Sequence, residues 1–269
     1  MRHFVIVSCL FVSTLLSATI TPTKTVAPIH EAVRHYDSNS LILFDIDNVL
    51  LTHSDMIFNL PEKERKPFID RLAAHHTPDE MNRFESLVWL NSPEQLLDPR
   101  MKRLIHDVQC RQIPVIALTK AGTGQWGYIP CSEEFRADAL KKVGIDFSPS
   151  FQNVKRISFD EFKVERPPVF TRGVLCTGKV SKGDTLRAFL KRTGFHPTRI
   201  LFVDDLRENL TSVEEACQEL GIAFEGFELT EVLETPILLD RELLEFQMRV
   251  LEQENRWLSD PEALHRMGR

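Results

Sequence analysis

Two aspartates, one residue apart, follow an apolar run near the start of the chain. In the stretch "LILFDIDNVLL", Asp45 and Asp47 come directly after Leu41–Phe44. A second acidic pair, Asp204 and Asp205, ends the similar stretch "RILFVDD". Carboxylates that lie close together repel one another unless a cation lies among them. Oxygen ligands of this kind suit Mg²⁺, which typically binds one or two carboxylates together with a phosphate oxygen.

A hydroxyl and a lysine complete a predicted phosphate-binding site. Thr119 follows the apolar run "IPVIAL", and Lys182 begins the helical pattern "KGDTLRAFLKRTG". Thr119 can donate a hydrogen bond to a phosphate, and Lys182 can neutralise charge. Simpler interpretations remain open at this point. Thr119 is also a good helix N-cap, Lys182 a candidate solvated lysine at a helix start, and the aspartates candidate turn or N-cap residues.

The elements that must position these side chains alternate between strand and helix. The runs "LILF", "IPVIAL", "RGVLCT" and "RILFV" are apolar without alternation, which is typical of parallel strands buried on both faces. Helical patterns lie in "DPRMKRLIHDVQCR", "KGDTLRAFLKRTG" and "NLTSVEEACQELG", and "IAFEGFEL" predicts a fifth strand. This order predicts an α/β fold with a doubly wound parallel sheet, in which ligands bind at the carboxyl ends of the strands.

Two inserts and a C-terminal segment flank the predicted core of residues 40–53 and 110–235. Residues 54–109 have helical patterns and are expected to form a small helical cap over the site. Residues 121–170 form a second insert, with a helix at "SEEFRADALKKVG" and then either a hairpin or the approach to the third strand. Residues 236–269 are predicted to be helical, and their apolar spacing favours packing on the core over binding a partner.

In combination, the motifs resemble a known superfamily. "FDIDNVL", "VIALT", "SKGDTLRAFL" and "ILFVDDLRENL", in this order, are similar to the haloacid dehalogenase-like (HAD) superfamily, whose fold is Rossmann-like. The resemblance covers residues 40–54 and 110–230. "GIDFS" and "GIAFEGFEL" are also similar to a bacterial HAD branch of unknown function that often carries a signal peptide.

The resemblance implies a Mg²⁺-dependent phosphatase that hydrolyses a small phosphate monoester through an aspartyl-phosphate intermediate. Asp45 would be the nucleophile, and Asp47 would protonate the leaving alcohol and then activate water. Thr119 would hold the phosphate, and Lys182 would screen the nucleophile and the phosphate. The implied metal ligands are side chains or carbonyls of the two acidic loops, with Asp47 acting through its backbone carbonyl: Asp45, Asp47, Asp204 and Asp205.

One position departs from the commoner pattern, and other interpretations stay open. Val49 stands where many phosphatases of the superfamily have threonine, whereas Asp47 argues against halide removal, because dehalogenases of this fold lack it. The alternatives are a catalytically quiet HAD-fold binding or surface protein, and a phosphomutase. Asn209 fits a position that steadies the last acidic loop. His53 is expected at the surface, and Trp126 and Tyr128 are candidates to line the pocket.

The N-terminus and the composition predict location and partners. Residues 1–18 are predicted to be a signal peptide, with a short basic start, no charge from Phe4 to Leu16 and a plausible cleavage site after Ala18. The run is too short to span a bilayer comfortably, although an uncut anchor remains an alternative. The protein is therefore expected to be exported, either periplasmic or secreted. A net charge of −6 does not favour nucleic-acid binding.

The cysteines left after cleavage are scattered and contain no CxxC, so a zinc site is not expected. The two remaining interpretations are ordinary core thiols and at least one disulfide. Nothing in the sequence indicates the oligomeric state.

Overall fold

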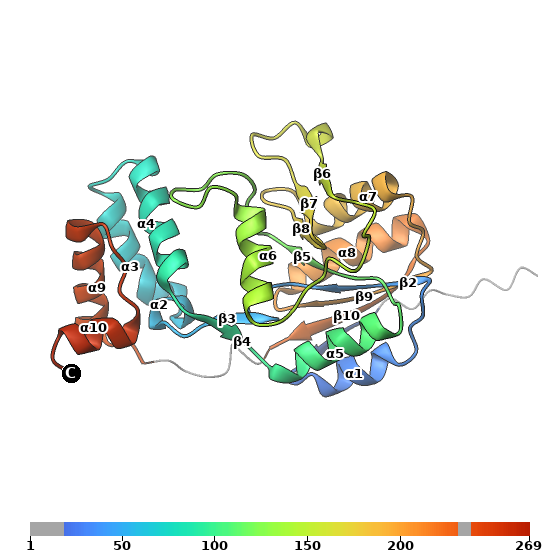
Figure 1. Ribbon diagram of the computed structural model, residues 1–269, viewed down its shortest axis with the longest axis horizontal. Coiled ribbons are helices and arrows are strands. Elements are labelled where there is room, and N and C mark those ends of the chain that lie inside the picture. Colours follow the sequence, from blue (N-terminus) through green and yellow to red (C-terminus); the bar gives the residue numbers. More distant parts are fainter. Residues whose placement is uncertain (1–18, 231–237) are drawn as a thin grey trace, which may run out of the picture.

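A single eight-stranded sheet forms the centre of the computed structural model, which describes residues 19–230 and 238–269 (Figure 1). The predicted signal peptide lies outside the described residues. The strands across the sheet are β1 (Thr19–Thr23), β10 (Ala223–Leu229), β9 (Arg199–Asp204), β2 (Ser40–Phe44), β5 (Val115–Thr119), β8 (Val174–Cys176), β7 (Val169–Thr171) and β6 (Arg156–Ser158). The strands β1, β10, β9, β2, β5 and β8 run parallel to one another. β7 is antiparallel to β8, and β6 is antiparallel to β7. The predicted α/β fold with a mostly parallel sheet is confirmed.

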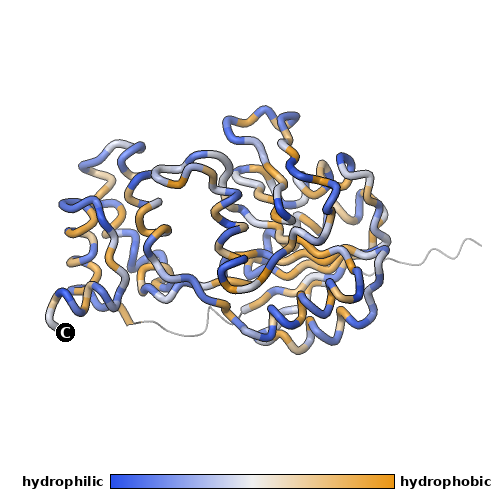
Figure 2. The backbone as a smooth tube through the Cα atoms, viewed as in Figure 1, coloured by the Kyte–Doolittle hydropathy of each residue, from blue (hydrophilic) through white to orange (hydrophobic). Residues whose placement is uncertain are grey.

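The central strands are apolar because helices cover both faces of the sheet. Every residue of β2 and β5 is buried, and Figure 2 shows the sheet as the most hydrophobic part of the chain. Alternate side chains of β2 enter opposite clusters: Ile42 and Phe44 on one face, Leu41 and Leu43 on the other. Helices α1 (Ala27–Val33), α5 (Pro99–Cys110) and α6 (Ser132–Lys142) cover the first face, and α7 (Lys182–Thr193) and α8 (Arg207–Leu220) cover the second.

The second insert ends in antiparallel strands, so the hairpin is the alternative that the structure adopts. β6 is followed by a single 3-10 turn, η1 (Asp160–Phe162), and then pairs antiparallel with β7, which pairs antiparallel with β8. The turn between β7 and β8 contains Arg172 and Gly173, both with positive φ. A Cβ at Gly173 would lie 2.3 Å from the carbonyl oxygen of Phe147, so only glycine fits this tight turn.

A separate apolar cluster forms the cap. Helices α2 (Met56–Asn59), α3 (Glu62–Ala73) and α4 (Pro78–Asn91) pack with the C-terminal helices α9 (Arg241–Glu254) and α10 (Asp260–Arg266), at the far end of the molecule from the sheet (Figure 1). The expectation that the C-terminal helix packs on the core is therefore wrong. Its apolar face, which includes Leu244 and Leu251, is buried against the cap, because the cap helices would otherwise leave their own apolar faces uncovered.

The helices within residues 54–109 divide between two parts of the molecule. α2, α3 and α4 belong to the cap cluster, whereas α5 packs on the sheet through Leu104 and Val108. The antiparallel pair β3 (Leu51–His53) and β4 (Glu94–Leu96) connects the cap helices to the core. The sequence patterns did not predict this pair, nor β1 and α1.

A buried carboxylate ties the cap to the C-terminal segment. Asp55, which is fully buried, accepts hydrogen bonds from Ser92 Oγ at 2.7 Å, from Trp257 Nε1 at 2.9 Å and from the backbone nitrogen of Asp260 at 3.0 Å. One donor follows α4 and two come from the C-terminal segment, and together they satisfy this buried carboxyl group. The cap and the C-terminal helices are thus joined by polar contacts as well as by apolar packing.

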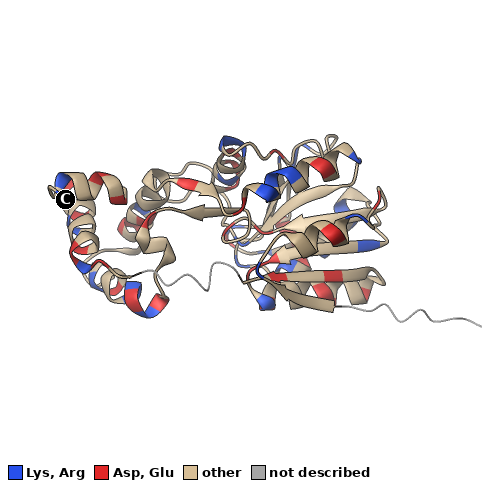
Figure 3. Cartoon of the chain, turned by 90° about the horizontal axis from the view of Figure 1, so that it is seen from below, with Lys and Arg blue, Asp and Glu red and all other residues tan. Residues whose placement is uncertain are grey.

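The outer surface carries charges of both signs, while the strands in Figure 3 are mostly free of them. The four cysteines of the described residues are free thiols, and no disulfide forms among Cys110, Cys131, Cys176 and Cys217. The core-thiol interpretation holds for Cys176 and Cys217, which are buried, but not for Cys110, which is exposed, or for Cys131, which is partly buried. Within residues 19–230 and 238–269, no helix is long and apolar enough to cross a membrane.

Candidate functional site

The predicted site residues meet at the carboxyl edge of the sheet. Asp45 follows β2, Thr119 ends β5 and Asp204 ends β9. Because β2 pairs with β9 on one side and with β5 on the other, these three positions are adjacent. Lys182 is the first residue of α7. The N-cap of this helix is Ser181, whose hydroxyl accepts from the backbone nitrogen of Asp184 at 3.0 Å.

Lys182 lies between two aspartates at the centre of the site. Its Nζ lies 3.0 Å from Asp45 Oδ1 and 2.6 Å from Asp204 Oδ2, and its side chain is fully buried. Burial on its own would lower the pKa of Lys182, but the two carboxylates outweigh it and raise that pKa. The ammonium is therefore charged. The interpretation of Lys182 as a solvated lysine at a helix start is excluded by its burial.

Each carboxylate of the centre is also held by its own neighbours. Asp45 Oδ1 accepts from the backbone nitrogen of Ile46 at 2.8 Å. Asp204 Oδ1 accepts from Asn209 Nδ2 at 3.0 Å and from the backbone nitrogen of Leu206 at 2.8 Å. Asn209, on the first turn of α8, thus lies where it steadies the second acidic loop. These contacts fix the orientation of both carboxylates toward Lys182.

Three carboxylates share this space with one ammonium. Ligand atoms of Asp45, Asp204 and Asp205 lie within 4.8 Å of one another. Burial raises the pKa of each to about 6. Repulsion from Asp47 and Asp205 further raises the pKa of Asp45, and repulsion from Asp45 that of Asp204, while Lys182 opposes both effects. Three negative charges against the single positive charge of Lys182 leave an excess that a divalent cation would balance. The donor set, made of carboxylate oxygens, fits a hard cation such as Mg²⁺.

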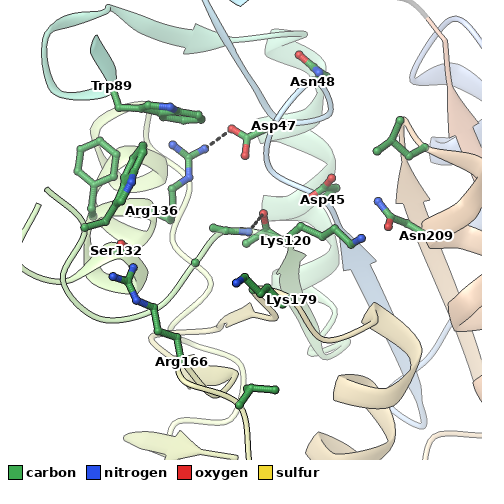
Figure 4. Close-up of a pocket in the computed structure, with 18 of the residues that line it drawn as sticks. Asp45, Asp47, Asn48, Trp89, Lys120, Ser132, Arg136, Arg166, Lys179 and Asn209 are labelled. Carbon is green, nitrogen blue, oxygen red and sulfur yellow. Dashed lines mark hydrogen bonds and ion pairs between the residues drawn. The ribbon is translucent and has the colours of Figure 1, made fainter. Parts of the chain in front are cut away.

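The carboxylate of Asp47 lies apart from this group and has a different partner. Arg136, a buried residue of α6, donates from Nη2 to Asp47 Oδ1 at 2.6 Å and from Nη1 to Glu94 Oε1 at 2.6 Å (Figure 4). The guanidinium also lies 5.2 Å from the ring centroid of Trp89. The side chain of Asp47 is therefore not part of the group formed by Asp45, Asp204 and Asp205, and its assignment as a ligand through the backbone carbonyl stays a prediction.

His53 lies beside this arginine and is buried, so its expected surface position is wrong. Its ring stacks on Phe58 at a centroid distance of 3.7 Å and meets Trp89 edge-on at 4.8 Å. Burial lowers the pKa of His53, and neither ring nitrogen has a hydrogen-bond partner among the described residues. Asp47, His53 and Glu94 are close enough to share a cation. The guanidinium of Arg136 already supplies the positive charge for both carboxylates.

A cavity of about 890 Å³ opens above Asp45 (Figure 4). Thr119 lines it, and its Oγ1 accepts from the backbone nitrogen of Ala121 at 3.2 Å. No helix follows Thr119 directly, because residues 121–131 form a loop before α6, so the N-cap interpretation does not apply. Trp126 lines the cavity as expected. Tyr128 is not part of its wall; its hydroxyl accepts from Asn255 Nδ2 at 2.7 Å.

Val49 is fully buried in the apolar cluster on one face of the sheet. A valine at this position contributes packing, and a threonine would place a hydroxyl among apolar side chains. Val49 therefore contributes to the packing of this face of the sheet.

Several residues of the cavity were not singled out from the sequence. They are cations and aromatic groups that line the cavity: Trp89, Lys120, Phe135, Arg136, Arg166 and Lys179. Arg136 gave no signal because it lies in a helix whose charged residues look solvated, 89 positions from the carboxylate that it contacts. Trp89 and Phe135 belong to helical patterns in which an aromatic residue is more often part of a core than of a pocket wall.

The fold and the site define an α/β protein with a lysine–carboxylate centre at the carboxyl edge of its sheet. The chain belongs to the family described as "Protein of unknown function (DUF2608)", whose sequence profile matches residues 22–264. An uncharacterised protein of Rickettsia felis is 28% identical over 170 residues, covering 62% of this chain and 53% of its own length. The chain thus matches about half the length of that relative.

Two further relatives match over more of their length. An uncharacterised protein of Rickettsia prowazekii is 22% identical over 95% of this chain and 93% of its own length. A protein of Chlamydia trachomatis named as a putative outer membrane protein is 24% identical over 82% of both chains. Among solved structures, a haloacid dehalogenase-like hydrolase from Streptococcus pneumoniae is 12% identical and covers 72% of this chain and 95% of its own, with a TM-score of 0.36.

Proposed function

We propose that the protein is a Mg²⁺-dependent phosphatase that hydrolyses a phosphate monoester through an aspartyl phosphate on Asp45. The observation that carries the proposal is the contact of Lys182 with Asp45 and Asp204, at 3.0 and 2.6 Å, directly below the cavity. A carboxylate held beside a buried ammonium and open to a cavity is placed to attack phosphorus. The ordered motifs that resemble the HAD superfamily agree with this chemistry.

The side chains divide the reaction between them. An oxygen of Asp45 forms a bond to phosphorus while the bond from phosphorus to the ester oxygen breaks, and Asp47 gives its proton to the leaving alcohol. Asp47 then takes a proton from the water that attacks the aspartyl phosphate, which releases inorganic phosphate and restores Asp45. Thr119 and Lys182 hold the phosphate oxygens. Arg136 keeps the carboxylate of Asp47 at the cavity wall.

The acidic residues of the two loops are the candidates to hold the metal ion. Asp45, Asp204 and Asp205 would bind Mg²⁺, and the ion would supply positive charge to the phosphate oxygens as charge develops on them. Their close approach and raised pKa values support this assignment.

Hydrolysis of a generic aryl phosphate tests the proposal. With Mg²⁺, the purified protein is expected to release the aryl alcohol, and Asp45→Asn is expected to reduce kcat on the order of a thousandfold or more, since it removes the nucleophile. The variant is nearly isosteric, and its melting curve checks that it folds. A wild-type protein that binds Mg²⁺ but is silent across a broad panel of phosphate monoesters would contradict phosphatase activity. That outcome would favour the catalytically quiet binding protein.

We further infer that the protein is exported. The uncharged run from Phe4 to Leu16 after a basic start supports this inference. The chlamydial relatives that are named as putative outer membrane proteins support it as well.

A further inference from the structure

The cavity above Asp45 is much larger than a phosphate group and has two kinds of wall. Its volume is about 890 Å³, and it extends from Asp45 toward the cap. Three half-buried aromatic side chains contribute to the wall: Trp89 from α4, Trp126 from the loop before α6, and Phe135 from α6. Three cations also line it: Lys120, Arg166 and Lys179 (Figure 4). A substrate that fills this space carries more than the phosphate that reacts.

The three cations have no acidic partner. Among the described residues, none of Lys120, Arg166 and Lys179 makes an ion pair or a side-chain hydrogen bond. Arg136 in the same cavity is different, since its charge is balanced by Asp47 and Glu94. The three come from separate segments: the end of β5, the second insert and the loop after β8. Away from Asp45, Asp47 and Asp205, the cavity is lined by the acidic side chain of Glu165 and by these three cations. This local surplus of positive charge favours an anionic ligand.

The reacting phosphate accounts for only part of this charge. Its place at Asp45 already has Lys182, Thr119 and the candidate Mg²⁺ site to balance it. Lys120, Arg166 and Lys179 are thus available to a second anionic group of the same molecule. The aromatic side chains supply flat apolar surface, with Trp89 and Trp126 in edge contact at a centroid distance of 6.3 Å. A planar ring stacks well on such surfaces.

We propose that the substrate is a phosphate monoester that carries a planar aromatic ring and a second anionic group that does not react. The ring contacts Trp126 and Phe135, and the second anion binds Lys120, Arg166 and Lys179. A nucleoside bisphosphate has this chemistry and serves as the probe. The inference rests on the proposed function, because the position of the reacting phosphate comes from it.

Binding measurements test the inference separately from turnover. Calorimetric titrations of the full-length Asp45→Asn variant with Mg²⁺ would compare adenosine 3′,5′-bisphosphate, adenosine 5′-monophosphate and ribose 5-phosphate. The bisphosphate is expected to bind about tenfold or more tightly than the monophosphate, because it adds charge-assisted hydrogen bonds. Ribose 5-phosphate is expected to bind about tenfold more weakly than the adenosine monophosphate, because it lacks the ring.

Variants identify the groups responsible. In the same background, Arg166→Ala with Lys179→Ala is expected to remove most of the preference for the bisphosphate and to leave monophosphate binding within about threefold. Arg103→Ala with Lys191→Ala is the matched control, since both residues are exposed and neither lines the cavity. Trp126→Ala is expected to remove the preference for adenosine monophosphate over ribose phosphate.

The outcomes separate this inference from the proposed function. Equal affinities for the three ligands, or a preference unchanged by the cavity variants, would overturn the inference even if the wild-type protein hydrolyses aryl phosphates. The expected order of affinities in a protein that hydrolyses nothing would support the ligand class and overturn only the phosphatase activity.

Discussion

At the scale of single residues, the most informative feature is the division of labour between the two aspartates of "DID". Asp45 contacts Lys182 in the buried centre, whereas Asp47 points to Arg136 at the cavity wall. The sequence predicted that these carboxylates share a site with Lys182 and Asp204, because motif spacing and strand ends are local signals. It did not predict Arg136 or Glu94, because pairing between distant helices and strands leaves no trace in periodicity.

Arg136 is a positioning residue for Asp47, and its removal is expected to affect both stability and rate. Arg136→Met leaves Asp47 and Glu94 without their shared cation, which is expected to lower the free energy of unfolding by about 3 kcal/mol. Because Asp47 is then no longer held at the wall, kcat for aryl phosphate is expected to fall more than KM rises. Urea unfolding and steady-state kinetics measure the two effects.

Two further variants serve as controls for Arg136→Met. Arg103→Met removes an exposed arginine and is expected to change the unfolding free energy by about 0.5 kcal/mol or less. Arg136→Lys keeps the charge but cannot bridge both carboxylates, so it should recover part of the stability and little of kcat. Unchanged kcat in Arg136→Met would rule out the positioning role.

The raised pKa values of Asp45, Asp204 and Asp205 predict how the free energy of unfolding depends on pH and Mg²⁺. The carboxyl pKa values of Asp45, Asp204 and Asp205 are raised from 3.8 to about 6. The folded protein therefore keeps these protons to a higher pH than the unfolded chain does. Without metal, the three groups lower stability as pH rises from about 4 to about 6.

Added Mg²⁺ should reverse this loss only where the carboxylates are charged. At about pH 7.5, saturating Mg²⁺ is expected to raise Tm by about 5 °C or more, and at about pH 4.5 it should have little effect. Thermal melts with and without the ion measure this. The double variant Asp204→Asn and Asp205→Asn serves as the control, and a Mg²⁺ effect of equal size in it would place the ion elsewhere.

At the scale of elements, the loop of the second insert reaches the cap through a glycine. A Cβ at Gly127 would lie 2.2 Å from Ser86 Oγ and 2.3 Å from the carbonyl oxygen of Asn82, both on α4. The backbone nitrogen of the next residue, Tyr128, donates to Ser86 Oγ at 2.9 Å. The loop that carries Trp126 therefore packs directly against α4, the cap helix that carries Trp89.

Gly127→Ala is expected to push this loop off α4 and to widen the cavity. The new methyl group would collide with backbone as well as side-chain atoms of α4. The substitution also places alanine at a φ of +54°, which is unfavourable for a residue with a Cβ. Tm should fall, and KM for aryl phosphate should rise. Gly124→Ala is the matched control, because it shares a positive φ of +71° but has open space around the new Cβ. If the two variants behave alike, the contact between the loop and α4 does not shape the cavity.

The elements that the sequence predicted have strong apolar patterns, whereas those that it did not predict are short or polar. The central strands and α5, α7 and α8 bury long apolar runs or stripes, so their periodicity is strong. β3 and β4 have only three residues each. β1 has the polar sequence "TITPT", with a proline that is tolerated because the strand lies at the sheet edge. The partner of α9 could not be predicted, because an apolar stripe shows that a face is buried without showing what buries it.

At the scale of the whole molecule, the proposed export of the protein depends on the uncharged run near its N-terminus. A fusion of the full chain to a reporter enzyme that is active only after export is expected to be active in a bacterial host. Leu10→Arg places a charge in the apolar run and should reduce reporter activity strongly, whereas Ser40→Ala in the mature part should not. Equal activity of the wild type and Leu10→Arg would contradict a signal function for residues 1–18.

The edge strand β1 places the first described residue at one edge of the sheet and the candidate site at the other. β1 runs parallel to β10, with Thr19 beside Glu225 and Thr23 beside Leu229, so Thr23 and not Thr19 lies toward the edge that carries Asp45 and Asp204. Thr19 therefore lies at the opposite edge of the sheet from these carboxylates. A label or immobilising group attached at Thr19 would leave the cavity above Asp45 accessible from the other edge.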